Sequence, residues 1–77
     1  LVESIDIYPN PSNDIFNFYS ESNIESIKVF DNQGKVIYLK TIRNIHGQID
    51  LSNFKKGIYF IEFSTLNNPQ FKKVLLN

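Results

Sequence analysis

The chain has 77 residues, no cysteine and no methionine, and its eight basic and eight acidic side chains give a formal net charge of zero. This length suits one small domain that buries roughly 60% of the surface its unfolded chain exposes. The composition excludes disulfides and thiolate metal sites, gives no charge that would attract nucleic acid, and contains no run of about eighteen apolar residues that could span a membrane.

Apolar and polar residues alternate with a period of two along most of the chain, and no stretch holds the spacing of an amphipathic helix. Alanine is absent, whereas isoleucine, phenylalanine and tyrosine are frequent, which favours strands. We therefore expect an all-β domain. The predicted strands span residues 4–8, 14–20, 26–31, 35–42, 46–51, 57–65 and 69–76. Seven short strands at this spacing predict an antiparallel immunoglobulin-like β-sandwich.

The first strand leads into Tyr8-Pro9-Asn10-Pro11. Proline lacks a backbone N–H, and the residue before a proline is held in an extended conformation. This stretch is therefore a rigid exit from the strand. The side chains of residues 12–14 bond readily to their own backbone and favour a turn back into the next strand. Such a stretch is more often a structural corner than a functional site.

A tight hairpin is expected at Asp31-Asn32-Gln33-Gly34, between residues 27–30 and 35–38. Aspartate commonly opens a type I turn, and glycine tolerates the left-handed conformation that follows it. Local chemistry therefore sets the register of this hairpin as much as packing does.

Residues 49–57 predict a strand, a helical turn begun by Asp50 or Ser52, and a stop at Gly57. Phe54 within the turn is expected to plug one end of the core. The following run, residues 58–63, is apolar on both faces except at Glu62, which is typical of a central strand.

The last predicted strand carries two adjacent lysines, which discourage pairing with other chains and favour an edge position. Either its even-numbered or its odd-numbered apolar residues face the core. The predicted core residues are Ile5, Ile7, Phe16, Phe18, Ile27, Val29, Ile49, Leu51, Phe54, Tyr59, Ile61, Phe63 and Val74.

Charge is divided unevenly along the chain. Residues 1–38 hold two basic and six acidic side chains, a net charge of −4, and residues 39–77 hold six basic and two acidic ones, a net charge of +4. Two interpretations follow. Opposite charges meet across neighbouring strands, or the second half presents a basic face to an anionic partner.

No catalytic constellation is predicted. His46 is the only histidine and is interpreted as a loop or strand-start residue, and no G-x-S-x-G elbow is present. Asp31 and Asp50 are accounted for by turn and cap positions. We therefore predict no enzyme, no cofactor and no metal site. Tyrosines on an exposed strand face could also stack on a sugar ring, and the candidates are Tyr8, Tyr19 and Tyr38.

Three features occur in a fixed order: Tyr8-Pro9-Asn10-Pro11, the hairpin at 29–36, and residues 49–52 followed by 57–59 and 72–76. Together they resemble the type A C-terminal sorting domain of the type IX secretion system of Bacteroidota, over nearly the whole chain. The sorting-motif residues that the resemblance implies are Tyr8, Pro9, Asn10, Pro11, Asp31, Gly34, Lys35, Gly57, Tyr59, Lys72, Lys73, Val74, Leu75 and Leu76.

The resemblance implies a non-catalytic C-terminal secretion signal on a larger cargo protein such as a hydrolase or adhesin. Because the chain begins at Leu1 instead of methionine, residues 1–77 are expected to be one module excised from such a cargo. The implied partners are shuttle proteins, the type IX translocon and a sortase-like surface peptidase that removes the module. The implied location is the periplasm in transit, then the cell surface or the medium.

For recognition we expect the last strand, residues 71–77, to pair edge to edge with a receptor, and Lys72 and Lys73 to steer the encounter. The alternative is an immunoglobulin-like accessory or carbohydrate-binding module of a secreted protein. The oligomeric state is left open.

Overall fold

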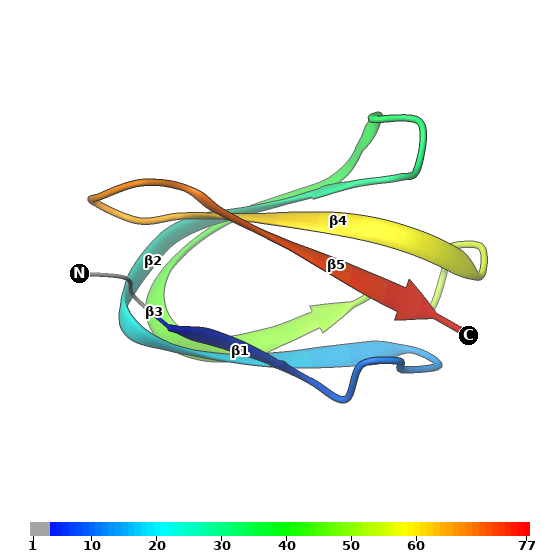
Figure 1. Ribbon diagram of the computed structural model, residues 1–77, viewed down its shortest axis with the longest axis horizontal. Helices are drawn as coiled ribbons and strands as arrows, with labels where there is room; N and C mark the ends of the chain where they lie inside the picture. The colour runs from blue at the N-terminus through cyan, green and yellow to red at the C-terminus, as the bar shows by residue number, and fades with distance from the viewer. Residues whose placement is uncertain (1–3) are drawn as a thin grey trace.

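The computed structural model describes residues 4–77 and holds five antiparallel strands in one sheet (Figure 1). The strands are β1 (Ile5–Tyr8), β2 (Ile15–Phe30), β3 (Val36–Asp50), β4 (Gly57–Ser64) and β5 (Gln70–Leu76). β3 pairs along the length of β2, whereas β1 and then β4 pair with the other side of β2, and β5 pairs with β4. The prediction of an all-β domain is confirmed.

The sheet curls because β2 and β3 are long and bend together, which places their two halves in facing layers (Figure 1). Between the pairs Tyr19–His46 and Ile24–Asn44, β2 advances five residues while β3 advances two. A second irregularity follows at once, and Arg43 in β3 has a φ of 52°. Bulges of this kind bend a strand and raise its twist without ending the ladder.

Because of these bulges, the number of strands is smaller than predicted. The predicted strands at 14–20 and 26–31 are the two halves of β2. Those at 35–42 and 46–51 are likewise the two halves of β3. The polar residues between the halves indicated turns, but the backbone pairing continues past them. The chain therefore has five strands where seven were predicted, and an immunoglobulin-like sandwich of two separate sheets is not confirmed.

The two irregularities also allow both halves of β2 to turn apolar side chains inward. Phe16 and Phe18 are buried in its first half, and Ile27 and Val29 are buried in its second half. Successive side chains of a strand point to opposite faces, so a regular strand would expose one of these two pairs. Ile24 lies beyond the larger bulge and is buried like the even-numbered Phe18, so the change of phase falls between Ile24 and Ile27, where the second irregularity lies.

The core lies inside the curl, with the rings of Phe18 and Phe63 5.5 Å apart near its middle. All but two of the predicted core residues are buried, and the exceptions, Ile7 and Phe54, are partly buried against the core. The buried apolar side chains are Ile5, Phe16, Phe18, Ile24, Ile27, Val29, Ile49, Leu51, Tyr59, Ile61, Phe63, Val74 and Leu76. Ile24 was not predicted because it lies between the bulges. The even-numbered face of β5 is the one that faces inward.

The predicted hairpin turn is confirmed. The N–H of Gly34 donates to the carbonyl of Asp31 over 3.0 Å, and Gly34 has a φ of 84°. Oδ1 of Asp31 also accepts from the N–H groups of Gln33 and Lys35, each over 2.9 Å. The aspartate side chain therefore braces both sides of the turn.

The predicted helical turn is a β-turn in the structure. The N–H of Phe54 donates to the carbonyl of Leu51 over 3.0 Å. The N–H of Ser52 donates to Oδ1 of Asp50 over 2.9 Å, so Asp50 does cap the turn. Hydrogen bonds from the side chain and backbone of Ser52 hold the pKa of Asp50 below its usual value.

β4 lies between β2 and β5, and β4 is the only one of the five strands that pairs with β5, so the predicted central and edge positions are both confirmed. His46 lies within β3 and is exposed, not in a loop or at a strand start. Within residues 4–77 no helix is long and apolar enough to cross a membrane.

Gly47→Ala tests the close approach of β3 to the core. A Cβ atom at Gly47 would lie 2.9 Å from Cζ of Phe18, whose ring is buried against Phe63. We expect the free energy of unfolding to fall by about 1–3 kcal/mol in chemical denaturation, as overpacked cores do. In a Phe18→Leu background the same substitution should cost much less. Equal costs in the two backgrounds would contradict this packing.

Candidate functional site

The segments that carry the sequence motifs gather at one end of the molecule, on the right in Figure 1. They are the turn after β1, the β2–β3 hairpin turn, the turn before β4 and the end of β5. We call this region the motif end and define it as residues 8–14, 31–35, 51–59 and 73–77. Contacts between these segments, described below, join the first of them to the last.

Asn10 holds the end of β5 through its side-chain amide. Nδ2 donates to the carbonyl of Lys73 over 3.1 Å, and Oδ1 accepts from the N–H of Leu75 over 3.0 Å. One side chain thus supplies the donor and the acceptor that a peptide unit of a neighbouring strand would supply.

Ser12 also contacts the end of β5, through its own backbone atoms. Its N–H donates to the carbonyl of Leu75 over 3.1 Å, and its carbonyl accepts from the N–H of Asn77 over 2.8 Å. Its buried hydroxyl donates to the carbonyl of Ile15 over 2.7 Å. We call Asn10 and Ser12 the clamp, because together they cover the outer edge of β5 from the Lys73 carbonyl to Asn77.

The prolines on either side of Asn10 form the predicted corner between β1 and the clamp. Pro9 and Pro11 are exposed, and the peptide bonds that precede them are both cis. Neither proline has an N–H to donate. The bonds to β5 therefore come from the Asn10 side chain and from the backbone of Ser12.

Two further hydrogen bonds tie the turn before β4 to the turn after β1. Nζ of Lys56 donates to the carbonyl of Asn13 over 2.7 Å. The N–H of Leu51 donates to the carbonyl of Asp14 over 2.9 Å. These two turns and the end of β5 therefore form a connected surface.

The hairpin turn and the start of β4 meet at a cavity of about 340 Å³. It is lined by Asp31, Asn32 and Gln33 from the hairpin and by residues 55–59. The hydroxyl of buried Tyr59 donates to the carbonyl of Lys55 over 2.5 Å. Within residues 4–77 no group of three or more histidine, cysteine, aspartate or glutamate side chains could hold a metal ion.

The sorting-motif residues have different surroundings. Tyr59, Val74 and Leu76 are buried and support the core, so their side chains do not face a partner of the folded domain. The other sorting-motif residues are exposed or partly buried: Tyr8, Pro9, Asn10, Pro11, Asp31, Gly34, Lys35, Gly57, Lys72, Lys73 and Leu75.

Strand alternation places Lys72 and Lys73 on opposite faces of β5, so the two lysines do not form one basic patch. Ser12 is the residue of the motif end that sequence reasoning missed. The hydroxyl of Ser12 is bonded to Ile15, three residues further along the chain. Nothing in this local sequence indicated that Ser12 also contacts the last strand.

Comparison with known proteins adds two findings. Residues 6–77 match the family described as "Secretion system C-terminal sorting domain". Beta-agarase D of Zobellia galactanivorans is 31% identical over 74 residues, which are 96% of this chain. The chain spans only 15% of the length of that relative.

Asn10→Ala tests the clamp. We expect the free energy of unfolding to fall by about 1–3 kcal/mol, because two hydrogen bonds of about 0.5–1.5 kcal/mol each are lost. Asn10→Asp should cost at least as much, since a carboxylate oxygen would replace Nδ2 beside the carbonyl of Lys73. Chemical denaturation followed by circular dichroism measures both variants.

The matched control is Asn13→Ala. The side chain of Asn13 makes no hydrogen bond in the described part of the chain, and its carbonyl bond to Lys56 survives the substitution. Its cost should stay within about 0.5 kcal/mol. If Asn10→Ala and Asn13→Ala unfold at the same denaturant concentration, the Asn10 side chain does not hold β5.

Proposed function

The chain belongs to the family of secretion system C-terminal sorting domains, and from this membership we propose that it is the address that takes a cargo protein through the type IX outer-membrane translocon. The proposal goes beyond membership in naming the route and the fate of the domain. The cargo would cross the inner membrane by a separate N-terminal signal and be recognised in the periplasm through this domain.

The observation that carries the proposal is the convergence of the family-type motifs on one end of the fold. Asn10 and Ser12 hold the last strand, and the Asp31 turn meets Lys55 and Tyr59 at the neighbouring cavity. A transport apparatus that handles folded cargo needs a rigid surface to recognise. The motif end supplies such a surface from segments far apart in the chain.

The proposed partners are periplasmic shuttle proteins, the translocon, and a sortase-like peptidase that cuts upstream of β1 at the cell surface. The proposed final location is the cell surface or the medium. The similarity to an agarase supports a cargo that acts outside the cell. The domain itself would be the signal, and activity would reside in the cargo.

A second candidate function is carbohydrate binding, and one observation favours it. Tyr8 and Tyr19 are 51% and 47% exposed. Tyr8 lies opposite Asn17, two residues from Tyr19, so the two tyrosines share the outer face of β1 and β2 as diagonal neighbours. Such a pair suits stacking on sugar rings. A sorting domain would be removed from the surface form, whereas a binding module would remain.

A fusion tests the proposal. Residues 1–77 are joined to the C-terminus of a fluorescent protein that carries an inner-membrane export signal and folds in the periplasm. In a Bacteroidota host we expect fluorescence in the medium, with the domain trimmed off. In the same host without its type IX translocon, fluorescence should stay inside the cell. The control is the fluorescent protein with its export signal alone.

Retention of the fusion in both hosts, with the domain shown to be folded, would contradict the sorting function. Glycan binding would then be measured on the same fusion. Loss of that binding in Tyr8→Ala and Tyr19→Ala variants would support the second candidate.

A further inference from the structure

The outer edge of β5 is open at its beginning. The backbone groups of Lys73, Leu75 and Asn77 that bond to the clamp point away from β4. Because this direction repeats every second residue, the N–H and carbonyl of Phe71 and the N–H of Lys73 point the same way. Within residues 4–77 these three groups have no hydrogen-bond partner. The clamp thus leaves a short stretch of the edge unpaired.

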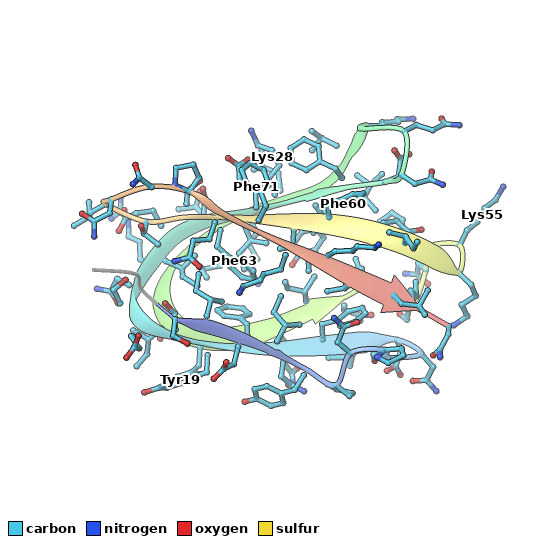
Figure 2. The ribbon with its side chains drawn as sticks, in the orientation of Figure 1. Tyr19, Lys28, Lys55, Phe60, Phe63 and Phe71 are labelled. Carbon is cyan, nitrogen blue, oxygen red and sulfur yellow. The ribbon has the colours of Figure 1, made fainter. Side chains whose placement is uncertain are left out.

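An apolar groove lies beside this open stretch. Phe71 is 61% exposed and lies opposite Glu62, so Phe60 is its diagonal neighbour on the outer face of the sheet. Phe30 lies opposite Phe60 on β2. These three rings line a groove of about 560 Å³ together with Asp31, Asn32 and Gly34. Figure 2 shows Phe60 and Phe71 on the outer side of the sheet and Phe63 on its inner side.

The charges on this face are unequal. Lys28 lies directly opposite Glu62, which places one positive and one negative side chain together. Lys73 is exposed two residues beyond Phe71 on the same face, and across the ladder it meets Phe60, not an acidic residue. An added strand that places an acidic side chain beside Lys73 would gain an opposite-charge pair.

We propose that the edge at Phe71–Lys73, with the groove of Phe30, Phe60 and Phe71, binds an extended segment of the export receptor as an added β-strand. That segment carries an apolar side chain beside Phe71 and an acidic one beside Lys73. Added strands gain affinity from main-chain hydrogen bonds and specificity from pockets for alternate side chains. Three free backbone groups allow only a short ladder, which suits a signal that must be released.

This inference rests on the proposed sorting function and narrows the expected recognition of residues 71–77. The remainder of that edge, from the Lys73 carbonyl to Asn77, is occupied by the clamp. The buried side chains of Val74 and Leu76 are also withheld from a partner. Within β5, recognition is therefore confined to the start of the strand.

The test uses the cargo fusion and four variants. Lys73→Pro removes the outward N–H but no bond to β4, a position where an edge strand tolerates proline. Lys73→Ala keeps that N–H and removes the charge, and Phe71→Ala keeps the backbone and empties the groove. Leu39→Ala is the matched control, since Leu39 is 65% exposed on β3, and β2 and β4 lie between β3 and β5.

We expect translocon-dependent export of Lys73→Pro to be slower by about tenfold, and that of Phe71→Ala by about fivefold or more. Lys73→Ala should lose about twofold, and Leu39→Ala should match the parent fusion. Thermal unfolding of each purified fusion shows whether the domain remains folded. If Lys73→Pro unfolds, Phe71→Ala and Lys73→Ala carry the test.

Folded variants that are exported at the parent rate, from a parent that needs the translocon, would overturn this inference and leave the sorting function in place. A parent fusion that is not exported through the translocon would overturn both. If the parent fusion is a dimer in sedimentation, and Phe71→Ala makes it monomeric without slowing export, the edge binds a second copy and the receptor strand is contradicted.

Discussion

The closure of the fold depends on holding its last strand, and the side-chain amide of Asn10 does this at the outer edge of β5. It takes the place of a neighbouring peptide unit between Lys73 and Leu75, which are 63 and 65 residues away in the chain. A domain of this size buries only a small apolar core, so each buried side chain matters for its stability. The strand that Asn10 holds contributes Val74 and Leu76 to that core. The clamp on one side and the ladder with β4 on the other therefore keep this part of the core covered.

Because of the same contact, the two halves of the last strand have different roles. Its second half is held by the clamp and fills the core, so it builds the domain. Its first half leaves backbone groups of Phe71 and Lys73 open beside an apolar groove, so it can present the domain to a partner. Under the proposed sorting function, this rigid body with one open edge would provide the surface that a receptor recognises.

Features set by neighbouring residues were predictable from the sequence. Asp31 and Gly34 gave the hairpin turn, and period-two alternation gave nearly all of the core. Features set by distant residues were not. Polar residues between Phe18 and Ile27 indicated a turn, although the change of phase between those two buried positions was a sign of the bulge. Nothing near Asn10 reveals a partner more than sixty residues away, so the clamp needed the structure.

Amide hydrogen exchange of the isotope-labelled fusion, measured residue by residue, tests most directly whether β5 has an open half and a clamped half. Only the signals of residues 4–77 are followed. The N–H groups of Phe71, Lys73, Leu75 and Asn77 all point to the same edge. The account predicts fast exchange at Phe71 and Lys73, and slow exchange at Leu75, whose N–H is bonded to Asn10. Similar rates at Lys73 and Leu75 would contradict it, because they would mean that the edge is either open or closed along its whole length.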